Sequence, residues 1–374
     1  MKNLEILIQE LCPDGVEFVK LGDVCEIKTG KGITQKDCSE SSKYPVYSGG
    51  KEPMGYYKEF NRNANTVTVS RVGAYAGFVN YVTEDFYLND KCFSVLPKKD
   101  EDINSKYLYY KLKALECSII NMQSGGGVPT INTKKVGSLE IPLPPIEVQT
   151  EIVRILDKFT SLEAELEAEL DCRKRQYEYY RDKLLSFDNV GGQEVEWKTL
   201  GELAEIGTGS SNTKDGLSEG LYPFYTRGQE VLRKNEYEFD DEAIITAGDG
   251  VGVGKVIHYV KGKYALHQRA YRFKPGNLLN ARFLYFYMTS TFYKYICGNS
   301  VSSSVSSLRK PRLLKYPIPL LPMEEQNRIV SILDRFESLT TSLQSGLPAE
   351  IAVRRQQYEH YRDKLLTFKR KGAA

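Results

Sequence analysis

The chain has 374 residues, which exceeds a typical single domain and favours two domains with connecting elements. Its 51 Lys and Arg residues nearly balance its 49 Asp and Glu residues, which excludes a uniformly basic coat for nucleic acid, and its 41% hydrophobic content excludes a largely disordered chain. No apolar run approaches the roughly 20 residues of a membrane span, and acidic side chains near the start argue against a signal peptide, so a cytoplasmic protein with no membrane contact is expected.

Residues 1–140 are predicted to form the first domain. Short β-rich runs such as ANTVTVSRV alternate with glycine-rich turns, and INSKYLYYKLKALE is predicted to form a helix. This mixture is typical of an α+β domain.

A long helix is predicted next, within a block that covers residues 141–187. Apolar side chains recur at steps of three and four residues, and LEAELEAEL consists of strong helix formers. From about residue 146 to 187 the helix would span roughly 63 Å at 1.5 Å per residue, more than a small domain needs. Its apolar stripe therefore needs a partner, in this chain or in another.

Residues 188–317 are predicted to form a second α+β domain, with the β-rich run AIITAG and the helical stretch LNARFLYFYMTSTF. Its segment 195–317 has more basic than acidic side chains, whereas the helical block before it is acidic. A second helical block covers residues 318–374. Gly346 and Pro348 within this block are expected to kink or interrupt its helix.

The two halves of the chain form an internal repeat. PIEVQTEIVRILDKF at 145–159 and PMEEQNRIVSILDRF at 322–336 share nine of fifteen residues, and YEYYRDKLLSF at 177–187 and YEHYRDKLLTF at 358–368 share nine of eleven. The two domains also contain similar short segments. LGDVCEIKTG aligns with LGELAEIGTG, and YPVYSGG aligns with YPFYTRG. The predicted fold class is therefore α+β, with two similar domains separated by two long helices.

No motif for catalysis or metal binding stands out. The run from Gly248 to Lys255 resembles a phosphate-binding loop, but Asp249 stands where glycine is needed and Val256 where Ser or Thr is needed, so a tight hairpin is the better interpretation. The three histidines have no catalytic spacing, the methyltransferase signature is missing, and the seven cysteines contain no CxxC pair and are expected to be free thiols.

Two aligned loop pairs differ in their polar residues, as direct base reading requires. LNDK at 88–91 aligns with LHQR at 266–269, although these could be ordinary exposed strand ends. The segments 124–135 and 302–312 combine small hydroxyl residues with basic ones, which suits phosphate contacts, although they could equally be linkers. The candidate DNA contacts in these loops and beside matched glycines are Lys28, Lys31, Arg71, Asn89, Lys91, Lys134, Lys135, Arg227, His267, Gln268, Arg269, Arg309, Lys310 and Arg312.

The repeated RDKLL sequence is a candidate for partner docking, although duplication of core residues would also explain it. The candidate docking residues are Arg181, Asp182, Leu184, Arg362, Asp363 and Leu365.

Together these features closely resemble the specificity subunit of type I restriction-modification enzymes. Each domain is followed by a helix that begins after IPLPP or IPLLP, continues through QxxIVxILDxF and ends in YxxYRDKLLxF. The resemblance implies a subunit without chemistry of its own that reads a bipartite site in double-stranded DNA, one half-site per target-recognition domain. It also implies that the two helices pack as an antiparallel coiled coil, set the half-site spacing and dock two methyltransferase subunits.

The resemblance further implies two ATP-dependent motor-nuclease subunits in the complete enzyme. S-adenosylmethionine, ATP and Mg²⁺ would bind to the partner subunits, and no cofactor or metal to this chain. Two alternatives remain open at this point, a stand-alone coiled-coil scaffold and a self-sufficient methyltransferase or nuclease. The first leaves the differing polar loops unexplained, and the second lacks the required motifs.

Overall fold

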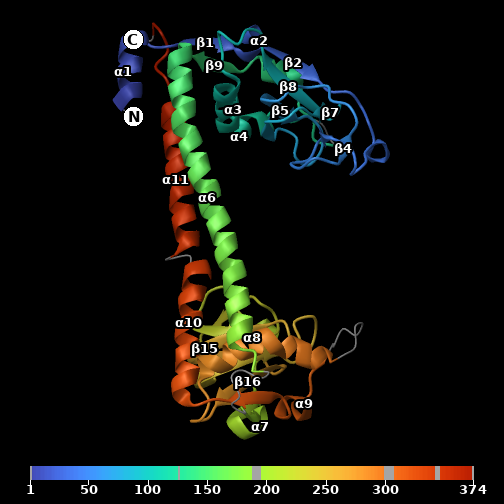
Figure 1. The fold of residues 1–374 in the computed structure, drawn as a ribbon, viewed down its shortest axis with the longest axis vertical. Coiled ribbons are helices and arrows are strands. Elements are labelled where there is room, and N and C mark those ends of the chain that lie inside the picture. Colours follow the sequence, from blue (N-terminus) through green and yellow to red (C-terminus); the bar gives the residue numbers. More distant parts are fainter. Residues whose placement is uncertain (1, 125–126, 188–194, 299–306, 342–345, 373–374) are drawn as a thin grey trace. The chain divides into compact units, whose positions relative to one another are not determined.

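The computed structural model describes residues 2–124, 127–187, 195–298, 307–341 and 346–372 (Figure 1). It divides into two compact units, of which unit 1 comprises Met1–Leu166 with Ile351–Ala374 and unit 2 comprises Glu167–Glu350. Each unit contains one β-rich domain and segments of two long helices. Each unit therefore combines the domain of one repeat with the last helical segment of the other repeat.

The domain of unit 1 is built on a four-stranded antiparallel sheet of order β2-β8-β5-β6. A three-stranded sheet of order β4-β3-β7 and a β1-β9 pair flank it. The backbone of Val16 bonds to that of Lys369 and Lys371, so the last described residues join this domain. Its elements are α1 (Lys2–Leu11), β1 (Glu17–Lys20), α2 (Leu21–Val24), β2 (Cys25–Thr29), η1 (Gln35–Asp37), β3 (Tyr44–Tyr47), β4 (Tyr56–Tyr57), β5 (Thr66–Ser70), β6 (Val79–Val82), β7 (Tyr87–Leu88), β8 (Cys92–Pro97), α3 (Ser105–Ala114), α4 (Glu116–Ile120), α5 (Thr133–Gly137) and β9 (Glu140–Leu143).

The domain of unit 2 repeats this plan of strands, but its sheets are joined. One six-stranded sheet of order β11-β16-β14-β15-β12-β13 replaces the four- and three-stranded sheets of unit 1, because the long strand β15 corresponds to both β6 and β7. The β10-β17 pair corresponds to the β1-β9 pair. The predicted α+β class and the two similar domains are thus confirmed. Its elements are β10 (Glu196–Thr199), α7 (Leu200–Leu203), β11 (Ala204–Thr208), η2 (Thr213–Asp215), β12 (Tyr222–Tyr225), β13 (Leu232–Lys234), β14 (Phe239–Ala247), β15 (Ile257–Leu266), β16 (Ala270–Pro275), α8 (Ala281–Cys297), α9 (Lys310–Leu314) and β17 (Pro317–Leu320).

The first helical block forms one helix, α6 (Ile146–Leu184), as predicted. The second block forms two helices, α10 (Met323–Thr341) and α11 (Leu347–Leu365), so the expected interruption is also confirmed. Gly346, just before α11, has a φ of +83°, and a Cβ atom there would lie 2.7 Å from the Ser338 carbonyl oxygen. Only glycine adopts this conformation without strain.

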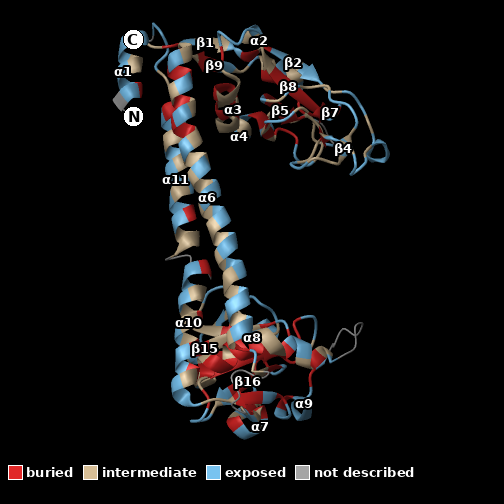
Figure 2. Cartoon of the chain, in the orientation of Figure 1, coloured by how far each residue is buried: buried red, intermediate tan, exposed pale blue. Residues whose placement is uncertain are grey.

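The helical segments run antiparallel within each unit. In unit 1, Phe159 on α6 stacks on Tyr361 on α11 with ring centroids 5.3 Å apart, and in unit 2, Tyr180 on α6 stacks on Phe336 on α10 at 5.7 Å. These are the same pair of repeat positions with the two helices exchanged. Buried residues lie mainly in the domains and at the helix ends, while the middle of α6 is exposed or half-buried (Figure 2).

A buried glutamine connects each domain to its helix. The Gln149 side chain on α6 is fully buried, its Oε1 accepts from the Asn104 N–H at 2.8 Å, and its Nε2 donates to the carbonyls of Asp102 and Pro144 at 2.9 and 2.8 Å. Gln326 on α10 repeats this arrangement in unit 2. Its partners are the N–H of Asn280 and the carbonyls of Leu278 and Leu321.

Replacement of Gln149 by leucine is expected to lower the free energy of unfolding by about 1–3 kcal/mol. The substitution keeps the approximate volume but leaves three backbone groups without their side-chain partner, and the carbonyl of Pro144 among them is buried. Equilibrium unfolding in urea measures the loss. Gln356→Leu on the exposed face of α11 is the matched control and should change stability by less than about 0.5 kcal/mol. Equal effects of the two substitutions would contradict the role assigned to Gln149.

Candidate nucleic-acid interface

A matched turn precedes β8 in unit 1 and β16 in unit 2. In unit 1, Asn89 Oδ1 accepts from the Lys91 N–H at 3.2 Å. In unit 2, His267 takes the same place, since its Nδ1 accepts from the Arg269 N–H at 2.9 Å and its Nε2 lies 3.2 Å from the Thr213 hydroxyl. One backbone shape is therefore held by two different residues.

The burial of Asn89 and His267 revises the prediction that they contact bases. Both side chains are almost fully buried, and Asn89 Nδ2 donates to the Ile33 carbonyl at 2.7 Å. Burial is the main cause that lowers the pKa of His267, and the positive charge of Arg227 is the next. The neutral ring can therefore accept the hydrogen bond from the Arg269 N–H. These two residues shape the turn. The exposed residues beside them are Asp90, Lys91, Gln268 and Arg269.

An acidic residue joins two predicted contacts in unit 2. Asp249 Oδ1 accepts from Arg227 Nη1 at 2.8 Å, and Asp249 Oδ2 accepts from Arg269 Nη1 at 3.1 Å. Although burial opposes it, the two guanidinium groups keep the pKa of Asp249 below its usual range. Asp249 was not among the predicted contacts. The signal for it in the sequence is an acidic residue where the other repeat has Val72.

Four loops meet at one edge of the unit 1 domain. The Lys31 N–H donates to the Leu88 carbonyl at 3.0 Å, the Arg71 N–H to the Lys91 carbonyl at 2.7 Å, and the Ile131 N–H to the Arg71 carbonyl at 2.8 Å. The loops thus brought together are 30–33, 71–77, 88–91 and 128–131. Both loop pairs singled out by their aligned differences belong to this edge.

The same loops meet in unit 2 through hydrogen bonds that match those of unit 1, except that the donor in the first loop lies one position later. The Ser211 N–H donates to the Leu266 carbonyl at 3.2 Å, and the Gly248 N–H donates to the Arg269 carbonyl at 2.9 Å. The Leu308 N–H donates to the Gly248 carbonyl at 2.8 Å and places the chain before α9 beside the β14–β15 loop. The tip of that loop carries Val251, a residue that is 97% exposed. Each domain therefore has an edge formed by four loops, which we call the composite edge. The two composite edges share a backbone arrangement and differ in their side chains.

The remaining predicted contacts in unit 1 are mostly exposed. Lys28 on β2 pairs with Glu26 at 2.7 Å, and Lys31 is exposed beside the matched turn. Arg71 is half-buried, and its Nε has no hydrogen-bond partner among the residues that the structure describes. Lys134 and Lys135 are exposed on α5.

In unit 2, Arg309, Lys310 and Arg312 are exposed at the beginning of α9. Arg312 Nη2 also donates to the Tyr295 carbonyl at 3.2 Å. Gln268 is exposed and donates to Asn212 Oδ1 at 2.6 Å. Parts of the two aligned segments, at 125–126 and 302–306, lie outside the described residues.

The candidate docking residues fall into two groups. The leucines pack inward, since Leu365 is buried in the unit 1 core and Leu184 packs against the unit 2 core. This favours duplication of core residues over partner docking as the reason why both leucines are repeated. The carboxylates of Asp182 and Asp363 are exposed, and each pairs with the preceding arginine, Arg181 or Arg362, at 2.8 Å. Only the charged pairs remain available to a partner.

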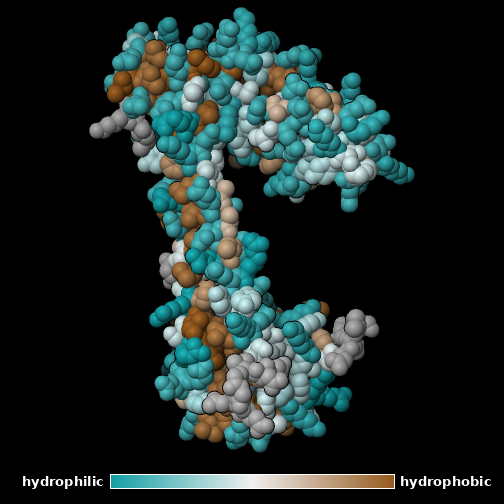
Figure 3. Space-filling view, viewed as in Figure 1, coloured by the Kyte–Doolittle hydropathy of each residue, from teal (hydrophilic) through white to brown (hydrophobic). Residues whose placement is uncertain are grey.

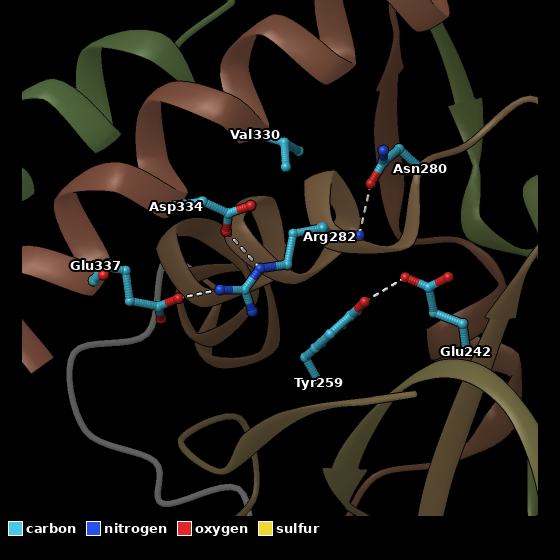
Figure 4. Close-up of a pocket in the computed structure, with 8 residues that line it drawn as sticks. Glu242, Tyr259, Asn280, Arg282, Val330, Asp334 and Glu337 are labelled. Carbon is cyan, nitrogen blue, oxygen red and sulfur yellow. Dashed lines mark hydrogen bonds and ion pairs between the residues drawn. The ribbon is translucent and has the colours of Figure 1, made fainter. Parts of the chain in front are cut away.

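A pocket of about 570 Å³ lies where the unit 2 domain meets α10 (Figure 4). Arg282 donates to Asp334 at 2.7 Å and also pairs with Glu337, while the Tyr259 hydroxyl donates to Glu242. Arg282 thus pairs with two carboxylates of α10 and fastens the domain to the helix. Lys106 and Asp157 form the corresponding pair in unit 1 at 2.8 Å.

Among the described residues, no group of three or more His, Cys, Asp and Glu side chains could hold a metal ion. The seven cysteines are free thiols. Within the same described ranges, no helix has the length and apolar character needed to cross a membrane.

Comparison with known proteins decides the family. A family model for the type I restriction modification DNA specificity domain matches residues 13–171 and again residues 193–353, once in each repeat. The chain belongs to the family of type I restriction-modification specificity subunits. As a specificity subunit it has two target-recognition domains, and each matched range contains one of the two β-rich domains described above.

Individual relatives of this specificity subunit agree with the family model. A type I restriction enzyme specificity subunit of Escherichia coli is 31% identical over 94% of this chain and 94% of its own length. A putative type I specificity subunit of Haemophilus influenzae is 29% identical over 98% of this chain and all of its own length. Both span the two repeats.

Solved structures share the fold of this specificity subunit. The S subunit of a type I system from M. genitalium is 19% identical and matches with a TM-score of 0.62 over 94% of this chain and 95% of its own. The HsdS subunit of Thermoanaerobacter tengcongensis is 18% identical and matches with a TM-score of 0.51 over 95% of this chain and 97% of its own.

Proposed function

We propose that each target-recognition domain of this chain reads one half of a bipartite site in double-stranded DNA. The observation that carries the proposal is the composite edge found in both domains, where equivalent backbone hydrogen bonds hold four loops whose polar side chains differ. A constant frame with variable side chains is what direct reading of two different half-sites requires. Exposed Lys134, Lys135, Lys310 and Arg312 suit the phosphate contacts that position a protein on DNA.

In the same proposal, the helices set the distance between half-sites and dock two methyltransferase subunits. Apolar side chains remain exposed on them, including Tyr179, Leu339 and Val353. Figure 3 shows apolar residues among polar ones along the α10 and α11 helices. Such side chains are suited to burial against a partner helix. Asp182 and Asp363, each beside its arginine, would provide equivalent charged contacts for the two subunits.

The chain itself contributes recognition and no chemistry. S-adenosylmethionine would bind to the methyltransferase subunits, and ATP and Mg²⁺ to two motor-nuclease subunits of the complete enzyme. This complex would act in the cytoplasm on double-stranded DNA.

The purified chain alone is expected neither to methylate nor to cleave DNA, and sequence-specific methylation should begin only when the methyltransferase subunit is added. A methylation assay with radiolabelled S-adenosylmethionine, run beside a gel shift with and without that subunit, measures both points. A matched mixture that contains the methyltransferase subunit alone is the control for residual transfer.

Methyl transfer by the repurified chain without a partner would favour a self-sufficient enzyme. A reconstituted complex that shows no sequence preference would instead favour a scaffold.

A further inference from the structure

The Arg227–Asp249–Arg269 cluster joins three loops of the unit 2 domain around one carboxylate. Arg227 follows β12, Asp249 lies in the loop between β14 and β15, and Arg269 precedes β16. Each carboxylate oxygen accepts one hydrogen bond, at 2.8 Å from Arg227 and at 3.1 Å from Arg269. The two guanidinium groups are therefore held beside each other, where they would otherwise repel.

Each guanidinium uses only its Nη1 atom in this cluster. Within the described parts of the chain, the Nε and Nη2 atoms of Arg227 and Arg269 have no hydrogen-bond partner, so each arginine keeps one complete two-donor edge. The Arg269 side chain is 61% exposed, against 39% for Arg227 and 26% for Asp249. The most accessible two-donor edge therefore belongs to Arg269.

A two-donor edge of this kind matches the adjacent O6 and N7 acceptors of guanine in the major groove. The geometry points to Arg269 as the reader of a guanine in the half-site of the unit 2 domain, with Asp249 as the positioning residue that fixes its side chain. The inference rests on the proposed function and extends it by naming the base. His267 supports the same residue from the backbone side, because its buried ring accepts the Arg269 N–H.

Stability alone does not explain the cluster. Ion pairs this exposed contribute little to folding, and the matched loops of unit 1 keep their shape without one. The repeat positions there are Gly49, Val72 and Lys91, which lack both a carboxylate and a guanidinium. The Arg227–Asp249–Arg269 cluster therefore occurs in the unit 2 domain and not in the unit 1 domain. This is expected for a feature that makes the two domains read different DNA sequences.

The test uses the complex with methyltransferase subunits and DNA duplexes in which each base pair of the site is replaced in turn. Arg269→Ala should reduce the preference for one G·C pair in the unit 2 half-site by about 5- to 150-fold and leave the other positions unchanged. Asp249→Asn, which removes the charge at constant shape, should reduce the preference at that same base pair. The double variant should lose little more than Arg269→Ala alone.

A chemical probe isolates the guanine contact. 7-Deazaguanine at the assigned position, which removes the N7 acceptor, should weaken binding of the unaltered complex and should have no further effect on Arg269→Ala. Lys310→Ala, expected to lose a phosphate contact, should weaken all sequences alike, and Lys274→Ala, exposed near the far end of β16, should change nothing. The preference for the unit 1 half-site and the thermal unfolding midpoint report whether each variant is folded.

Uniform weakening by Arg269→Ala, or a full 7-deazaguanine effect in that variant, would overturn the guanine contact. A change at a different base pair in Asp249→Asn would overturn its positioning role. Either result leaves the proposed function intact as long as the unaltered complex prefers one bipartite sequence. Absence of any such preference in the unaltered complex would contradict the proposed function itself.

Discussion

Exchange of residues 195–317 for the corresponding segment of another specificity subunit is expected to change one half-site of the DNA target completely and leave the other unchanged. The physical reason is that the unit 2 domain has its own core and its own composite edge. This core continues onto the helical segments through Leu185, Ile329 and Leu333. Gln326 and the Arg282–Asp334 pair add matched polar contacts. A replacement that keeps these partners should dock on the same helices.

Sequencing of methylated DNA from cells that contain the chimaera, with matching methyltransferase subunits, measures the result. The same kind of exchange at residues 16–140, in the first domain of this chain, is the matched control and should change only the other half-site. Changes in both half-sites after either exchange would mean that the two domains do not read independently.

Insertion of one further LEAE unit after Glu169 is expected to lengthen the unspecified gap between the half-sites by one or two base pairs. Leu162, Leu166 and Leu170 repeat at four-residue steps in the middle of α6 and are half-buried along its stripe. Four added residues lengthen the helix by about 6 Å and rotate its end by about 40°. At about 3.4 Å per base pair, that distance corresponds to between one and two base pairs.

Methylated-site sequencing of the insertion variant should show both half-sites preserved and the original spacing lost. The double substitution Ala164→Gln and Ala168→Gln changes the same exposed stretch at constant length and should keep the original gap. If the insertion variant is active and its gap is unchanged, the leucines form only an apolar stripe and the helices do not determine the spacing.

Local patterns were sufficient to predict most of the architecture. The three- and four-residue spacing of apolar residues predicted α6, the pair Gly346 and Pro348 predicted the break between α10 and α11, and the repeat predicted two domains with one plan. Each of these features depends on neighbours in the chain, since helix periodicity and backbone restriction act over a few residues. The family likewise follows from short motifs in the helical blocks.

The composition of the candidate interface depended on strand pairing. Arg227, Asp249 and Arg269 lie far apart in the sequence and meet only because β12, β14 and β16 belong to one sheet. Asn89 and His267 looked like exposed strand ends, yet the turn folds over them and uses their polar atoms internally. The sequence shows which polar residues differ between the repeats. Only long-range packing decides which of them face solvent, because burial is set by contacts between segments that no local pattern specifies.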